Sequence, residues 1–119
     1  MKAIIQVRVT DMDAAGHVSS PRLIELLITA HYQLLTPVGW VIRRQDLCYH
    51  RPVTAEVTRV AVHTTPARVG RTSLTLRSAM AHCDSTDLLY LESTTVWVYT
   101  DPVTRQPAPL PPAVISRTS

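Results

Sequence analysis

Hydrophobic and polar residues alternate through five segments of this chain, as they do in strands that are buried on one face. The first segment, "KAIIQVRV" at residues 2–9, places Ile5, Val7 and Val9 on one side. The other four segments span residues 40–51, 55–65, 68–82 and 88–100. Turn signals separate these four segments, namely Pro52, Pro66 and the sequence "CDSTD". The pattern therefore predicts five strands, four of which follow one another.

One stretch departs from the alternation. From Arg22 the segment "RLIELLITAHYQLL" is apolar almost all round, which is typical of a helix that other elements enclose. Ser20 stands where an N-cap is expected, and Pro21 stands at the first helical position, where a missing N–H costs nothing. We expect the helix to end near Thr36-Pro37.

This order of elements predicts an α+β domain in which an antiparallel sheet of about five strands wraps around one long central helix. We assign the domain to residues 1–100. Prolines recur through the remaining segment, "DPVTRQPAPLPPAVISRTS" at residues 101–119. They should preclude a packed element, so we expect a tail that lies on the surface or is disordered.

The composition indicates a single globular domain and argues against nucleic-acid and membrane partners. A chain of 119 residues with 45% hydrophobic residues is one globular domain. Its net charge of +3 suits a ligand that carries phosphates and falls short of the footprint of a nucleic-acid binder. No apolar run approaches the roughly 18 residues of a membrane helix, and the start does not resemble a signal peptide. We therefore expect a cytoplasmic protein with neither nucleic acid nor membrane as a partner.

The cysteines and histidines carry no metal signature. Cys48 and Cys83 are far apart in the sequence, and we expect both to be reduced and packed. His31 and His50 have no partners at ligand spacing, so no metal is expected.

The loop before the helix, "VTDMDAAGHVSS" at residues 9–20, has two interpretations. Taken alone, Asp11 and Asp13 are turn residues and the serines cap the helix. Alternatively, an acid lies beside a helix start whose unpaired N–H groups stabilise a developing oxyanion. The local pattern by itself favours the turn.

Four motifs change that balance. The loop and its apolar helix resemble the D-x-D-x-x-G-[HV]-V loop of hotdog-fold thioesterases of the 4-hydroxybenzoyl-CoA thioesterase family. Three further segments match this family in the same order and together cover nearly the whole chain: "YHRP" at 49–52, "RVGRTSLTL" at 68–76 and "DPVTRQPAPLPP" at 101–112, which resembles a closing D-x-x-T-G-[RK]-P-x-P-[IL]-P. Two places depart from the pattern. Ser19-Ser20 stands where many members carry larger polar residues, and "VTAEV" replaces the usual Gly-Asp after R-P.

The resemblance implies a thioesterase that converts an acyl-CoA or acyl-carrier-protein thioester into free acid and thiol. Asp13 matches the catalytic acid, as a nucleophile or as a general base that deprotonates water. The N–H of Ser20, with that of Arg22 or Leu23 nearby, is expected to hold the oxyanion. Gly16 should adopt a backbone conformation barred to other residues and let the substrate pass closely. His17 and Ser19 are expected to orient the loop or line the site, with plain structural roles equally open.

Further residues are candidates for substrate binding. Guanidinium groups suit phosphate geometry. Candidates to meet the phosphates of coenzyme A are therefore Arg43, Arg44, Arg68 and Arg71, although solvated charges at strand edges are an equally good interpretation of each. Thr72 and Ser73 should lie beside the pantetheine, although packing is an equally good interpretation. Glu25 is either a second acid or, more simply, an outward-facing residue. Candidates to line the acyl pocket are Leu27, Tyr32 and Trp40.

Several points stay open at the level of the sequence. A hotdog dehydratase is disfavoured, because such enzymes place a histidine and an acid across the helix start. A non-catalytic acyl-thioester-binding protein remains a second reading because of Ser19-Ser20. The resemblance also implies a homodimer or a dimer of dimers, with sheets joined edge to edge and each site completed by the partner chain. No cofactor is expected beyond coenzyme A or phosphopantetheine within the substrate.

Overall fold

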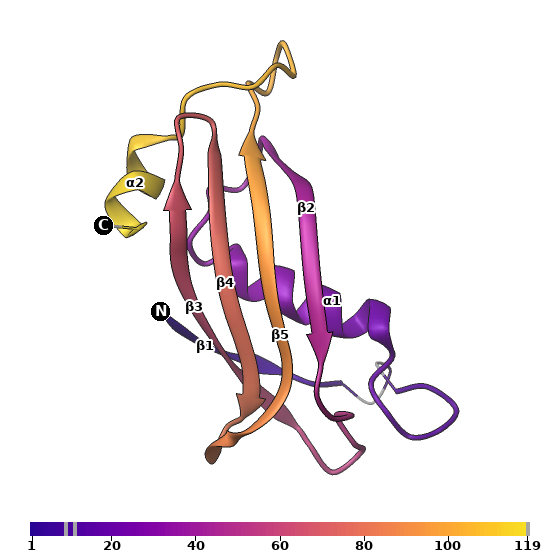
Figure 1. Ribbon diagram of the computed structural model, residues 1–119. Helices are drawn as coiled ribbons and strands as arrows, with labels where there is room; N and C mark the ends of the chain where they lie inside the picture. Colours follow the sequence, from indigo (N-terminus) through magenta and orange to yellow (C-terminus); the bar gives the residue numbers. More distant parts are fainter. Residues whose placement is uncertain (9, 11, 119) are drawn as a thin grey trace.

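The protein folds as one antiparallel sheet packed on a helix (Figure 1). The structure is a computed structural model that describes residues 1–8, 10 and 12–118. Its elements are β1 (Lys2–Gln6), α1 (Ser20–His31), β2 (Trp40–Tyr49), β3 (Arg59–Val69), β4 (Ser73–His82), β5 (Ser85–Tyr99) and α2 (Pro112–Thr118). The strand order is β1-β3-β4-β5-β2. The predicted α+β class and the five antiparallel strands are confirmed.

Helix α1 crosses one face of the sheet, and its start lies on the side of the sheet where β2 is (Figure 1). The helix buries Leu23, Leu26, Leu27 and Ala30 against apolar side chains of the sheet that include Val60, Val62, Met80 and Leu91. Strand β2 forms one edge of the sheet, and among the described residues no strand pairs with its outer side. The other face of the sheet carries no helix in Figure 1.

The prediction of one long central helix is wrong. Helix α1 has 12 residues and ends at His31. Beyond it the chain tightens into turns, in which the N–H groups of Gln33 and Leu34 donate to carbonyls three residues back. Leu34 and Leu35 are nevertheless buried, in a second apolar cluster with Trp40, Leu74, Leu76 and Trp97. The apolar pattern therefore continues past the helix because the turn is buried too.

Pro66 does not end a strand, although the sequence suggested that it would. Strand β3 runs to Val69, with Pro66 opposite Leu76 of β4 and an irregularity between Pro66 and Arg68. Strand β1 pairs with β3 only from Arg59 to His63. Pro66 thus lies where β3 has become an edge of the sheet, a position at which a residue without an N–H is tolerated.

The expectation that residues 101–119 contain no packed element is also wrong. Pro112 begins the seven-residue helix α2, where a proline costs no hydrogen bond. Leu110 and Val114 are buried in the second apolar cluster. Nη1 of Arg117 donates to the carbonyls of Leu34 and Leu35, at 3.3 and 3.4 Å. The segment thus closes the core beyond the end of α1, although its prolines obscured that in the sequence.

No helix in the described part of the chain is long and apolar enough to cross a membrane.

A chain of polar side chains joins α1 to the sheet between the two apolar clusters. His31 is fully buried. Its Nδ1 accepts a hydrogen bond from Trp97 Nε1 at 3.0 Å, and its Nε2 lies 2.9 Å from Ser78 Oγ. Ser78 Oγ in turn lies 2.8 Å from Thr64 Oγ1. Burial lowers the pKa of His31 to about 4, so the ring is neutral at physiological pH.

The buried histidine makes stability fall with acid. An unfolded histidine binds a proton near pH 6.5 and His31 in the fold binds one only near pH 4, so the unfolded state takes up protons first between these values. We expect the free energy of unfolding to decrease by about 2 kcal/mol from pH 7 to pH 5 through this residue alone. Chemical denaturation at both pH values measures the change. The non-titrating variant His31→Gln should lose this part of the pH dependence, and an equal pH dependence in both proteins would contradict the assignment.

Candidate functional site

The Asp13 loop is a small hairpin fastened to the core. Met12 and Val18 pair as an antiparallel bridge, and Met12 packs against the first apolar cluster, to which Val18 belongs. The N–H of Val18 donates to the carbonyl of Val53 at 2.9 Å, and His17 forms a bridge with Thr54. The hairpin therefore holds Asp13 opposite His17, immediately before the start of α1. No motif indicated the anchor at residues 53 and 54, because it uses only backbone groups. Asp11 lies outside the described residues.

The two oxygens of the Asp13 carboxylate have different surroundings. Oδ1 accepts the N–H of Ala15 at 2.9 Å and that of His17 at 3.1 Å, which shapes the turn. In the described residues Oδ2 has no hydrogen-bond partner, and the side chain is exposed. The turn interpretation and the chemical interpretation are therefore compatible, because one oxygen builds the loop while the other faces solvent.

Gly16 and His17 serve this turn. Gly16 has φ +78°, a left-handed conformation that glycine adopts without strain. A Cβ there would meet nothing within 4 Å, so the glycine is required for its backbone angle. The N–H of His17 is one of the two donors to Asp13, while its ring is partly buried.

The helix begins one residue earlier than the sequence suggested. Ser19 is the N-cap and Ser20 is the first helical residue, and the Ser19 side chain makes no capping hydrogen bond. The expectation that Leu23 supplies an oxyanion donor is wrong, because its N–H donates to the carbonyl of Ser19 at 3.0 Å. Pro21 has no N–H to offer. Ser20 is exposed, and its N–H has no partner within the described residues.

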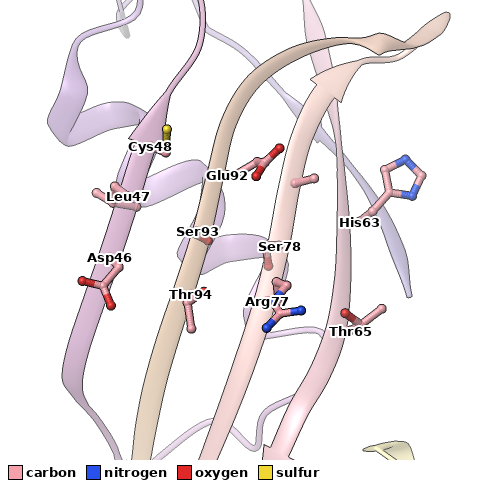
Figure 2. A pocket seen from close by; sticks show the side chains of 11 residues that line it. Asp46, Leu47, Cys48, His63, Thr65, Arg77, Ser78, Glu92, Ser93 and Thr94 are labelled. Atoms are coloured by element: carbon pink, nitrogen blue, oxygen red, sulfur yellow. The ribbon is translucent and has the colours of Figure 1, made fainter.

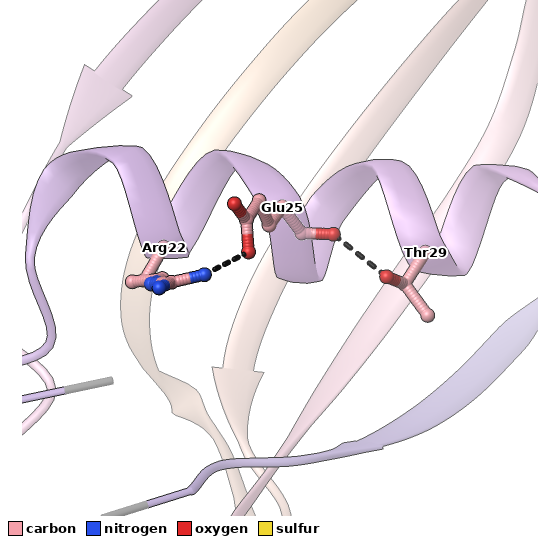
Figure 3. Close-up of polar contacts among 3 residues, drawn as sticks. All are labelled: Arg22, Glu25 and Thr29. Carbon is pink, nitrogen blue, oxygen red and sulfur yellow. Dashed lines mark hydrogen bonds and ion pairs between the residues drawn. The ribbon is translucent and has the colours of Figure 1, made fainter. Parts of the chain in front are cut away.

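Glu25 is engaged with residues of its own helix. Its Oε2 accepts a hydrogen bond from Nη1 of Arg22 at 2.8 Å, and its carbonyl accepts one from Thr29 Oγ1 at 2.8 Å (Figure 3). Both charged side chains are substantially exposed. They border a hollow of about 400 Å³ between α1 and β1. The simpler of the two expectations for Glu25, an outward-facing residue, therefore describes it.

The four arginines singled out from the sequence come together. Arg43, Arg44, Arg68 and Arg71 line one hollow of about 470 Å³ on the face of the sheet opposite α1. The other side chains that line it are Ser73, Thr75 and Val96. Among the four arginines, only Arg44 is paired with a carboxylate within the described residues, that of Asp46 at 3.1 Å. We call this hollow the arginine pocket. Thr72 is partly buried at the turn between β3 and β4 and is not among the lining residues.

The arginine pocket and the Asp13 hairpin lie at opposite ends of the chain's sheet (Figure 1). The pocket includes the end of β3 and the start of β4, whereas the hairpin is tied to residues that follow the end of β2. Strand β2 alone has 10 residues, which span about 30 Å. The candidate site residues of one chain therefore form two groups that are well separated.

A further hollow of about 480 Å³ lies in the middle of the same outer face (Figure 2). Side chains of both charges line it, among them Arg77, Asp46 and Glu92, and neither Asp13 nor the start of α1 reaches it. Cys48 also lines it and is free but exposed, so the expectation of a packed side chain is wrong for this cysteine. The described residues contain no cluster of three or more His, Cys, Asp or Glu suited to a metal ion.

The candidate acyl-pocket residues do not share one surface. Leu27 is buried in the first apolar cluster and Trp40 in the second. Tyr32 is exposed and contacts Trp97 edge to face. Nothing in this arrangement identifies an acyl tunnel within a single chain.

An antiparallel sheet packed on one helix, with this loop at the helix start, is a hotdog-type fold. The chain belongs to the thioesterase-like superfamily, whose family model matches residues 7–117. Curated protein sequences give no significant match. The fold resembles a thioesterase from Thermus thermophilus in complex with coenzyme A and zinc, with 23% identity, a TM-score of 0.79 and coverage of 98% of this chain and 90% of that one.

Two other solved structures show the same fold. A 1,4-dihydroxy-2-naphthoyl-CoA thioesterase from Synechocystis is 18% identical, with a TM-score of 0.84 and coverage of 98% of this chain and 93% of that chain. A protein from Pseudomonas aeruginosa is also 18% identical, with a TM-score of 0.87 and coverage of 99% and 88%. At these identities the likeness concerns the fold.

Proposed function

We propose that the protein hydrolyses acyl-CoA thioesters, with Asp13 as the catalytic carboxylate and the start of α1 as the oxyanion site. The observation that carries the proposal is the Asp13 hairpin. One oxygen of the carboxylate holds the loop, the other is open to solvent, and the helix start follows directly. Membership of the thioesterase-like superfamily supports the reaction class.

The chemistry needs a nucleophile and a place for negative charge. Oδ2 of Asp13 either attacks the thioester carbonyl, giving a mixed anhydride that water opens, or removes a proton from the attacking water. In both routes the carbonyl oxygen becomes negative, and the N–H of Ser20 at the positive end of α1 stabilises it. The thiolate leaves and takes up a proton. The reaction uses no cofactor, since coenzyme A enters as part of the substrate.

A direct assay tests this function. Purified protein is incubated with a panel of acyl-CoA thioesters of differing length and polarity, and the release of free thiol is followed. Turnover of at least one ester is the expected result. Binding of these esters without thiol release over hours would instead support a non-catalytic acyl-thioester-binding protein. Rapid-quench mass spectrometry of the protein during a single turnover separates the two routes, because only the nucleophilic route transiently adds the acyl group to Asp13.

The arginine pocket supports coenzyme A as the carrier of the acyl group. Four guanidinium groups face one hollow and a single carboxylate compensates them within the described residues. Such crowding of like charge is unfavourable unless an anion is bound there. A hollow of about 470 Å³ has the size of a small-ligand site. We assign it to the phosphates of coenzyme A.

Loss of an arginine from the pocket should weaken substrate binding and leave the chemistry intact. We expect Arg71→Ala or Arg43→Ala to raise KM for acyl-CoA about 10-fold with little change in kcat, because each loses a charged hydrogen bond to phosphate. The same acyl group on pantetheine, which lacks those phosphates, should be hydrolysed equally well by variant and parent. Arg77→Ala on the same face is the control and should keep the parental KM. An unchanged KM for the pocket variants would remove the phosphate assignment.

We further propose that the protein acts as a homodimer joined along β2. A ten-residue edge strand without a neighbour exposes unpaired backbone groups, which favour pairing with another edge. Antiparallel pairing with the β2 of a second copy reverses the ends of the two sheets. Each arginine pocket then lies at the same end of the joined sheet as the Asp13 hairpin of the other protomer, where we propose that these two groups serve one site.

A further inference from the structure

His31 lies at the opposite end of α1 from the proposed oxyanion site. Helix α1 spans about 18 Å from Ser20 to His31. The imidazole has no exposed surface and sits between the first and second apolar clusters. Both of its ring nitrogens are hydrogen-bonded to side chains of the sheet, through Trp97 on β5 and Ser78 on β4.

These bonds select one form of the ring. An indole N–H can only donate, so Nδ1 of His31 must be the unprotonated acceptor. In the neutral ring the proton therefore resides on Nε2 and is donated to Ser78 Oγ, 2.9 Å away. Ser78 then shares a hydrogen bond with Thr64 on β3. A protonated ring would set the N–H of Nδ1 against the N–H of Trp97, so the cation breaks this arrangement.

Among the described residues, the other contacts between α1 and the sheet are apolar and contain no directional hydrogen bonds. Leu23, Leu26, Leu27 and Ala30 pack against aliphatic side chains, and apolar packing is non-directional. A helix held only in this way can rotate or slide by a fraction of a residue at small cost. Hydrogen bonds from one side chain of α1 to two neighbouring strands, β4 and β5, by contrast specify both the rotation of α1 and its position along its axis.

We propose that His31 is a positioning residue, whose bonds to Trp97 and Ser78 set α1 on the sheet and thereby place the Ser20 N–H relative to Asp13. The catalytic part of this inference rests on the proposed function. Trp97 of β5 and Ser78 of β4 bind the ring, Thr64 of β3 binds Ser78, and none of these side chains carries a charge. Tyr32, which follows His31 in the sequence, contacts Trp97 edge to face, and Arg117 donates to the carbonyls of Leu34 and Leu35 just beyond the end of α1.

A set of four variants tests the role. His31→Leu removes both bonds, whereas His31→Gln keeps an acceptor for Trp97 and a donor for Ser78. Ser78→Ala removes the partner of Nε2. Ser93→Ala is the matched control, because Ser93 lies directly opposite Ser78 on β5 and is equally buried, but its Oγ has no hydrogen-bond partner in the described part of the chain.

The expected result is a split between kcat and KM. Because misplacement by about 1 Å can cost about 100-fold in rate, we expect His31→Leu to lose about 10-fold or more in kcat while KM changes little. Ser78→Ala should lose less, His31→Gln should recover most of the rate, and Ser93→Ala should match the parent. If His31→Leu does not fold, Trp97→Phe takes its place. Parental kcat in both Ser78→Ala and the His31 or Trp97 variant would overturn the proposal.

A second readout does not depend on activity. Nitrogen NMR of the imidazole should show a protonated Nε2 and an unprotonated Nδ1. The amide signal of Ser20, about 18 Å away along the helix, should shift in Ser78→Ala and stay in place in Ser93→Ala. If these signals behave as expected and no thioester is hydrolysed by the parent protein, the proposed function fails and the positioning of α1 stands. If Ser20 does not respond, the positioning role is wrong whatever the activity.

Discussion

Asp13→Asn should abolish most thioester hydrolysis while leaving the protein folded as before. The amide oxygen of asparagine can still accept the N–H groups of Ala15 and His17, so the hairpin is retained. The group that faces solvent becomes an amide, which neither attacks a carbonyl nor takes a proton from water. Positioned general bases contribute about 100-fold to 10,000-fold, and we expect a loss of at least about 100-fold in kcat. The rate of thiol release and the melting temperature are to be measured together.

The chain offers a matched control for this variant. Oδ1 of Asp101 also accepts two backbone N–H groups, from Val103 at 2.8 Å and Thr104 at 3.0 Å. These bonds lower the pKa of Asp101. The residue follows the end of β5, and that end of β5 lies away from the start of α1 (Figure 1). Asp101→Asn should therefore keep the parental rate. Full activity of Asp13→Asn would show that Asp13 is only a turn residue, and Asp13→Ala would then cost stability alone.

The periodic parts of the sequence predicted the sheet well, because alternation reports directly which face of a strand is buried. Ala3 and Ile5 of β1 are buried on one face, and Leu74, Leu76 and Met80 of β4 likewise. The same signal failed at the end of α1. Leu34 and Leu35 continue the apolar pattern in a turn. Their hydrophobicity predicted that they are buried, but it could not show whether the backbone there forms helix or turn hydrogen bonds.

Prolines were over-interpreted for a related reason. A proline excludes a backbone donor, which is harmful only where that donor has a partner to meet. Pro66 lies where β3 is an edge, and Pro112 lies in the first turn of α2. In both places tertiary structure decided whether the missing N–H mattered. The spacing of prolines in the sequence does not show which part of β3 lacks a neighbouring strand, or that α2 begins at Pro112.

The sequence named candidate residues for the site and did not indicate how they are arranged in the fold. The motif order singled out Asp13 and the arginines, and the structure gathers the four arginines around one pocket. Nothing in the motifs indicated that this pocket and the Asp13 hairpin occupy opposite ends of the sheet. Their separation is a property of the strand order, and strand order depends on pairings between distant segments.

The separation of the arginine pocket from the Asp13 hairpin predicts that a dimer of two different variants regains activity. Let one copy carry Asp13→Asn and the other carry Arg43→Ala with Arg71→Ala, and let the mixed dimer be purified through two different tags. If each arginine pocket serves the hairpin of the partner, one of the two sites in the mixed dimer contains both defects and the other contains none. At low acyl-CoA concentration the mixed dimer should then show about half of the parental rate, because a two-fold dimer has two equivalent sites.

The opposite geometry makes the opposite prediction. If a pocket served the hairpin of its own chain, each site of the mixed dimer would carry one defect, and the rate at low acyl-CoA concentration would stay near the low rates of the two variant homodimers. The two variant homodimers supply the baseline, since neither variant can form an intact site when it pairs with itself. A monomeric protein in solution would contradict the proposal directly. One substrate molecule would then have to reach both groups of a single chain, which are separated by the length of β2, about 30 Å. Recovery of half of the rate therefore reports that each site takes its arginine pocket from one copy and its Asp13 hairpin from the other.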